Sequence, residues 1–160
     1  MENRDIDKQY KAIKKLIDNT QISTHGDLEL QGHWGRYLCI LVSGFLENAI
    51  SAVYIDFVSE SASPAVIKYA TNIINKINNP KSNRFVETAK QFKVEWGEEL
   101  EIFFRNNDNY KTAIDNIMTN RHLIAHGKNS SISVHNVSLY FYDSVEVIKF
   151  IEKQCKNRAR

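Results

Sequence analysis

Apolar residues recur every three or four positions along most of the chain, which is the spacing of amphipathic α-helices. The stripe that starts at Ile6 predicts a first helix that ends near Asn19, and a polar loop over residues 23–33 follows. Residues 34–58 are apolar around most of the circumference of a helix. They predict a central helix that is packed by neighbours on several sides.

Shorter segments with helical spacing follow, and the alternation typical of strands is weak throughout. Asp108 is the predicted N-cap of the penultimate helix, and Gly127 suits a left-handed position at its C-terminal end. The pattern predicts an all-α bundle of about five or six helices in one domain over residues 1–160. We expect the later helices over residues 64–77, 84–92, 96–104, 109–126 and 139–151.

Composition fits a globular domain and adds no strong functional signal. The chain is 42% hydrophobic and 25% charged, and its net charge of +2 is too small to indicate nucleic-acid binding by itself. Cys39 and Cys155 lie in different contexts and fit free thiols in a reducing compartment. The N-terminus lacks the apolar core of a secretory signal, and polar residues interrupt the apolar segment 37–58. We therefore expect a cytoplasmic protein with no membrane association.

An arginine interrupts the apolar stripe of the predicted helix over residues 109–126. Ile114 and Ile117 are followed on the same stripe by Arg121. Because a guanidinium is always charged, this position needs a carboxylate, a solvent-filled cleft or an anionic ligand. Glu47, the only charged residue in segment 37–55, is the candidate carboxylate. A buried Glu47–Arg121 ion pair with a purely structural role is one interpretation of this pattern.

His126 ends the same helix, five positions after Arg121. Helix geometry places it roughly 140° around and about 7.5 Å further along, so the two side chains do not share a stripe. Convergence on one ligand then requires a long reach or a second copy of the helix in a C2 dimer. His122 and His126 have the i, i+4 spacing of metal ligands, but Leu123 replaces the glutamate of the zincin motif. We predict no metal, and a histidine metal site remains an alternative.

The segment NRHLIAHGK, residues 120–128, resembles the R-x4-6-H motif of the HEPN superfamily. Arg121 and His126 occupy the motif positions, and His122 takes the polar position after the arginine. The stretches HWGRYLCILVSGFLENAI, INNPKSNRF and SISVHNVSLYFYDSVEVIKFIE are similar to the bacterial RiboL-PSP-HEPN branch. The resemblance implies a helical bundle, a homodimer with facing motif helices, and a metal-independent endoribonuclease that needs no cofactor.

The resemblance also implies roles for individual residues. His126 would assist proton transfer while the 2'-hydroxyl of RNA attacks its own phosphodiester, and Arg121 would stabilise charge on the phosphate. The products would be a 2',3'-cyclic phosphate and a 5'-hydroxyl. Glu47 resembles the acidic position of the second helix and would orient Arg121 or His126.

Three further positions have weaker support. Asn120 and His122 flank the motif and either bind phosphate and shape the cleft or are ordinary surface residues. Lys128 and the basic end of the chain, residues 153–160, are candidate contacts to the RNA backbone.

The sequence leaves three functional hypotheses. The first is a dimeric ribonuclease that serves as a toxin or phage-defence effector, with an antitoxin or another regulatory protein as a partner. The second is a HEPN module that has lost catalysis and binds RNA or a protein. The third is a metal protein that uses His122 and His126.

Overall fold

The computed structural model describes residues 1–157, which form seven helices. Lys93 alone separates α4 from α5, because its extended backbone (φ −150°, ψ 132°) ends one helix and begins the next. The all-α class is confirmed, and the seven helices of the described residues correspond to the seven segments with helical spacing, although the bundle is predicted to have about five or six. Residues 158–160 of the basic C-terminal stretch lie outside the described residues. The helices are α1 (Arg4–Ser23), α2 (Leu28–Ser59), α3 (Pro64–Ile74), α4 (Ser82–Phe92), α5 (Val94–Asn106), α6 (Asp108–Ala125) and α7 (Val134–Lys156).

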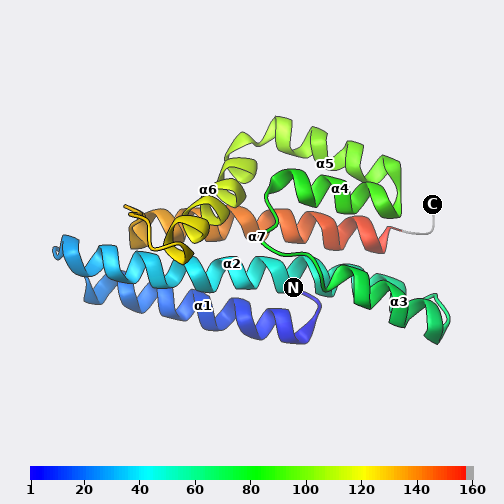
Figure 1. The fold of residues 1–160 in the computed structure, drawn as a ribbon, viewed down its shortest axis with the longest axis horizontal. Helices are drawn as coiled ribbons and strands as arrows, with labels where there is room; N and C mark the ends of the chain where they lie inside the picture. Colours follow the sequence, from blue (N-terminus) through cyan, green and yellow to red (C-terminus); the bar gives the residue numbers. More distant parts are fainter. Residues whose placement is uncertain (158–160) are drawn as a thin grey trace.

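α2 is the central helix of the bundle (Figure 1). It packs along its length against α1 and α7, while α6 crosses it near one end and α3 follows at the other. α4 and α5 form a hairpin that is held to α7 by the stacked rings of Phe103 and Phe150, whose centroids are 4.2 Å apart. The core includes the fully buried side chains of Leu38, Val42, Leu46, Ile50, Ile117 and Phe141.

The first two helices are both longer than the pattern predicts. α1 ends at Ser23, about one turn late, and α2 begins at Leu28, inside the predicted loop. The reason is a cap: Oδ1 of Asp27 accepts a hydrogen bond from the Leu30 N–H at 2.9 Å. Leu28 is 84% exposed, so the added turn has no burial pattern that periodicity would detect.

At 32 residues, α2 is long and apolar enough to cross a membrane by length and composition alone. In this fold, however, 61% of its most apolar window is buried inside the protein. A core helix satisfies the same criterion, and α2 is the core helix here, as the sequence predicts.

α6 carries the candidate motif and begins one residue earlier than expected. Asn107, not Asp108, is the N-cap residue, and its side-chain Nδ2 donates to the Phe103 carbonyl at 2.9 Å. Asp108 is the first helical residue, where its charge favours the helix dipole. Ile117 of the seam is fully buried, and Arg121 is half-buried.

Candidate functional site

α6 ends in a turn that fixes the position of His126. Gly127 has φ +64°, and the N–H groups of Gly127 and Lys128 donate to the carbonyls of Ile124 and Leu123 at 3.1 and 2.8 Å. This pair of hydrogen bonds is the Schellman motif, in which the first residue beyond the cap is left-handed and glycine is favoured. The prediction for Gly127 is confirmed, and His126 is the C-cap residue.

The two histidines of the motif lie together on the exposed side of α6. The rings of His122 and His126 have centroids 4.4 Å apart and planes inclined by 57°. Arg121 lies on a different, half-buried side of the helix. One chain therefore brings the two imidazoles together, while Arg121 stands apart from their stripe, as its spacing predicts.

Arg121 carries a charge that no carboxylate neutralises within residues 1–157. Glu47, the expected partner, instead accepts a hydrogen bond from the backbone N–H of Asn79 at 2.5 Å. The predicted Glu47–Arg121 pair is therefore wrong for the single chain. The pair does not form because the backbone of the segment between α3 and α4 donates a hydrogen bond to the Glu47 carboxylate, which is therefore engaged elsewhere.

Cys39 of α2 lies directly beneath the motif helix. Its thiol donates to the Ile117 carbonyl at 3.4 Å. Burial raises the pKa of the Cys39 thiol to about 12, although the Arg121 N–H acts in the opposite direction. The thiol is thus neutral at physiological pH, and it is a buried contact between α2 and the backbone of α6.

Asn120 positions the loop that follows the motif. Its Nδ2 donates to the Asn116 carbonyl at 2.9 Å, and its Oδ1 accepts from the Ser130 hydroxyl at 2.7 Å. Ser130 is only 3% exposed, and its Oγ also accepts the Ile132 N–H at 3.5 Å. The Asn120 side chain therefore links α6 to the loop that follows it, on the two sides of the turn that contains His126. No pattern in the sequence indicates the role of Ser130, because its partner Asn120 is ten residues away.

Gly35 fixes the same loop against α2. A Cβ atom at this position would lie 2.2 Å from the Ile132 carbonyl oxygen and 2.9 Å from the Ser133 Cα. Only glycine permits this approach of the two backbones. The loop between α6 and α7 is consequently hydrogen-bonded to α6 at Ser130 and in close backbone contact with α2 at Ile132 and Ser133.

Lys128 lies just past the cap and is exposed. Its side chain belongs to none of the ion pairs found in the described part of the chain. Its backbone, by contrast, is held by the cap. It remains a predicted contact to RNA.

The alternative of a metal site rests on His122 and His126 alone. Over residues 1–157 no group of three or more His, Cys, Asp or Glu side chains is arranged to hold a metal ion. Structural zinc sites use four protein ligands, and catalytic ones use three. Two imidazoles from one chain do not form such a site.

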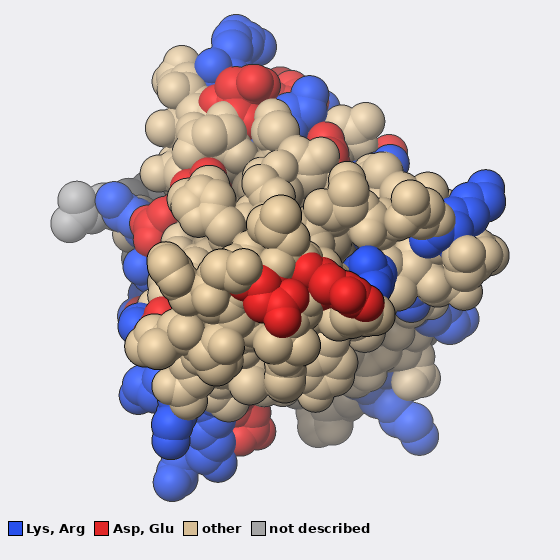
Figure 2. Space-filling model, turned by 90° about the vertical axis from the view of Figure 1, so that its left-hand side faces the viewer, with Lys and Arg blue, Asp and Glu red and all other residues tan. Residues whose placement is uncertain are grey.

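The surface near the motif is not broadly basic. Figure 2 looks at the end of the molecule on the left of Figure 1, where the turn between α1 and α2 and the end of α6 lie. Uncharged residues dominate this face, acidic side chains lie near its middle with a basic group beside them, and most basic ones lie around its edge. Attraction of a polyanion to this end therefore depends on individual cations.

An all-α bundle that presents an arginine and a C-capping histidine on its penultimate helix has the features of a HEPN domain. The model of the RiboL-PSP-HEPN family matches residues 2–157, so the chain belongs to that family. No curated protein and no solved structure matches it significantly. HEPN domains are commonly ribonucleases, and membership supports a nuclease or RNA-related role.

Proposed function

We propose that the protein is a metal-independent endoribonuclease that cleaves RNA through Arg121 and His126. The observation that supports this most is the half-buried guanidinium of Arg121, which has no carboxylate partner in the described chain. A cation in that environment favours an anionic ligand, and an RNA phosphate is one.

The chemistry needs few groups because RNA supplies its own nucleophile. The 2'-oxygen forms a bond to phosphorus while the bond from phosphorus to the 5'-oxygen breaks. The 2'-hydroxyl loses a proton and the departing 5'-oxygen gains one, which yields a 2',3'-cyclic phosphate and a 5'-hydroxyl. His126 assists proton transfer, and Arg121 stabilises the charge that develops on the phosphate oxygens.

A second copy of the chain completes the proposed site. Arg121 and His126 emerge on different sides of α6, so a C2 dimer with facing α6 helices would bring the arginine of one copy near the histidine of the other. Tyr37 and Ile40 are 52% and 38% exposed on α2, which α6 crosses. They are suited to be dimer contacts.

Such an activity must be restrained in the cell that makes it. We include in the proposal that the protein is a cytoplasmic toxin or phage-defence effector held in check by an antitoxin or another regulatory protein. Expression of wild type should then slow host growth, and expression of His126→Ala at the same level should not.

The direct test is cleavage of a mixed RNA pool by purified wild type and His126→Ala in excess EDTA. We expect wild type to leave cyclic-phosphate ends and His126→Ala to be slower by about a hundredfold or more. Circular dichroism controls for folding, because His126 is exposed and its loss should leave the helices intact. Equal cleavage by both proteins would mean a contaminant or a site elsewhere.

The alternative is a HEPN module that binds RNA or a protein without cleaving. The engagement of Glu47 by Asn79 favours it, because the carboxylate expected to orient the site is occupied in the single chain. Under this alternative neither protein cleaves, and alanine at Arg121 or His126 weakens the dimer, which light scattering would detect.

A further inference from the structure

Two arginines share a feature that the other described arginines lack. Arg36 and Arg121 are half-buried and belong to no ion pair within residues 1–157. Of the others, Arg4 and Arg105 are exposed, and Arg84 has a carboxylate oxygen at 3.4 Å. A partly desolvated guanidinium without a carboxylate favours an external anion. The reasoning that applies to Arg121 therefore applies to Arg36.

Arg36 lies on the stretch of α2 that contacts α6 and the loop after it. On α2 it follows Gly35, which touches the loop after α6, and it precedes Cys39, which touches α6 beneath Arg121. Three residues correspond to about 4.5 Å along a helix and roughly 60° around it. Arg36 is therefore within one turn of the contact between Cys39 and α6, which crosses α2 near this end of the bundle (Figure 1).

A histidine orients Arg36 without neutralising it. Nη2 of Arg36 lies 2.9 Å from Nδ1 of His33, and the guanidinium is the donor in this contact. The Glu29 carboxylate is 3.9 Å from Nε2, the other ring nitrogen of His33. It favours the tautomer with its proton on Nε2, which leaves Nδ1 free to accept. The Nη1 side adjoins Gly32, where even an added Cβ would be 3.7 Å away.

We propose that Arg36, oriented by His33, is a second phosphate-binding subsite that holds an RNA phosphate next to the scissile one. The inference rests on the proposed function, since it places the scissile phosphate at Arg121. One nitrogen of the guanidinium is used by His33, and the remaining N–H groups can donate to phosphate oxygens. This subsite acts in binding, so its role is distinct from that of the catalytic pair.

The expected effects are specific to a phosphate contact. Removal of one charged hydrogen-bonding group should weaken RNA binding about tenfold. It should also lower the slope of log affinity against log salt by about 0.7, the value for one phosphate on a single strand. In cleavage, Arg36→Ala should raise KM and leave kcat near that of wild type.

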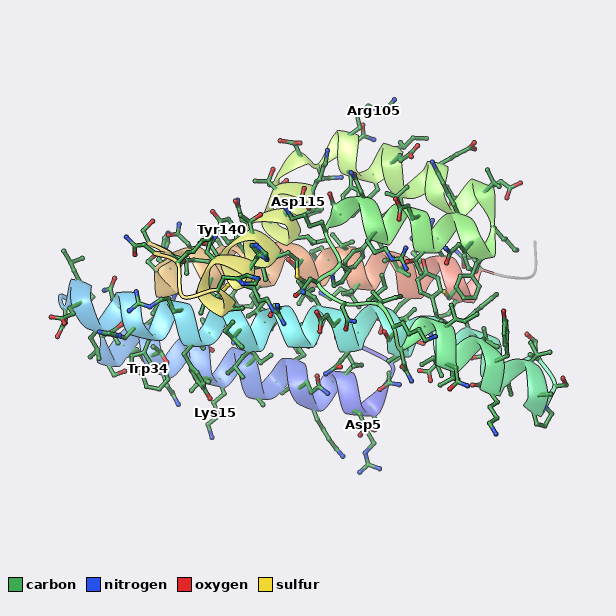
Figure 3. All side chains as sticks on the ribbon, in the orientation of Figure 1. Asp5, Lys15, Trp34, Arg105, Asp115 and Tyr140 are labelled. Atoms are coloured by element: carbon green, nitrogen blue, oxygen red, sulfur yellow. The ribbon has the colours of Figure 1, made fainter. Side chains whose placement is uncertain are left out.

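The experiment is fluorescence anisotropy of a labelled single-stranded 2'-fluoro oligonucleotide, which cannot be cleaved by 2'-hydroxyl attack. Affinity is measured at several salt concentrations for wild type, Arg36→Ala, His33→Ala and the control Arg105→Ala. Arg105 is exposed on α5, far from α2 (Figure 3). We expect the largest loss for Arg36→Ala, a smaller one for His33→Ala, and none for Arg105→Ala.

The outcomes separate this inference from the proposed enzyme. If Arg36→Ala cleaves RNA but binds the probe with the affinity and salt slope of wild type, the subsite is overturned and the enzyme stands. If wild type binds the probe without cleaving RNA, and Arg36→Ala binds more weakly with a smaller slope, the subsite stands and the enzyme fails. A change of oligomeric state by light scattering, without a change in affinity, would make Arg36 an interface residue and overturn the inference, as would a wild type that does not bind the probe.

Discussion

Two charged side chains on α6, those of Asp115 and Arg121, differ in whether the protein supplies a partner for the charge. Asp115, labelled in Figure 3 where α6 meets the start of α4, accepts hydrogen bonds from the Ser82 backbone N–H at 2.8 Å and from its hydroxyl at 2.9 Å. Ser82 is 2% exposed, so this contact is well shielded from water. Less than two turns later, the half-buried Arg121 has no carboxylate partner within residues 1–157.

The difference separates a structural charge from a candidate functional one. The Asp115 carboxylate attaches the start of α4 to α6 and satisfies two donors that burial would otherwise leave unpaired. Glu47 belongs with Asp115, because it holds the Asn79 backbone. Arg121 interrupts an apolar seam without an ion pair to any carboxylate of residues 1–157, and such violations of local consistency are expected at functional sites.

Arg121→Met should therefore abolish function and raise stability. Methionine continues the seam of Ile114 and Ile117 and removes a charge from a half-buried position. We expect RNA cleavage to fall by roughly a hundredfold or more. Stability should rise by about 0.5–1 kcal/mol, which is roughly 1–4 °C in Tm for a chain of this size. Cleavage assays and thermal unfolding measure the two effects.

A loss of stability in Arg121→Met would contradict the comparison, because it would show that the guanidinium is satisfied as Asp115 is. Arg105→Met is the matched control, since Arg105 is exposed on α5. It should change neither cleavage nor Tm by a comparable amount.

Asp115→Ala should produce the reverse result, with a loss of stability and no specific loss of activity. The change leaves the buried N–H and hydroxyl of Ser82 without their partner. We expect a cost of about 2 kcal/mol, or roughly 4–8 °C in Tm. Glu98→Ala, which removes an exposed carboxylate from α5, should stay within about 0.5 kcal/mol of wild type. If Asp115→Ala keeps the Tm of wild type, Asp115 is not the anchor of α4.

The fold was predictable to the extent that burial follows periodicity. Ile6 and Ile17 of α1 and the apolar face of α2 are buried as their spacing predicts. The first turn of α2 was not predictable, because it is stabilised by the cap at Asp27 and its exposed Leu28 belongs to no buried stripe. A helix boundary that depends on one capping residue is difficult to predict, because the cap leaves no periodic pattern of apolar residues in the sequence.

The candidate site divides in the same way. Gly127 and the pairing of His122 with His126 depend on residues less than two turns apart, and a helical reading of the sequence finds both. The partner of Glu47 depends on the path of a segment 32 residues further along the chain. The close approach of Gly35 to Ile132 likewise joins distant segments, and the periodicity of a single sequence shows neither contact.

The smallest effect we predict compares two glycines that have the same backbone conformation. Gly26 has φ +84° and Gly127 has φ +64°, and nothing lies within 4 Å of a Cβ atom added to either. Alanine should cost about 1 kcal/mol at both positions, because the left-handed conformation is unfavourable to it while space is available. Urea unfolding should give similar losses for the two variants. Only Gly127→Ala should also reduce cleavage per folded molecule, because Gly127 ends the helix directly after His126. Equal activity of the two variants would show that the cap stabilises α6 without positioning the histidine.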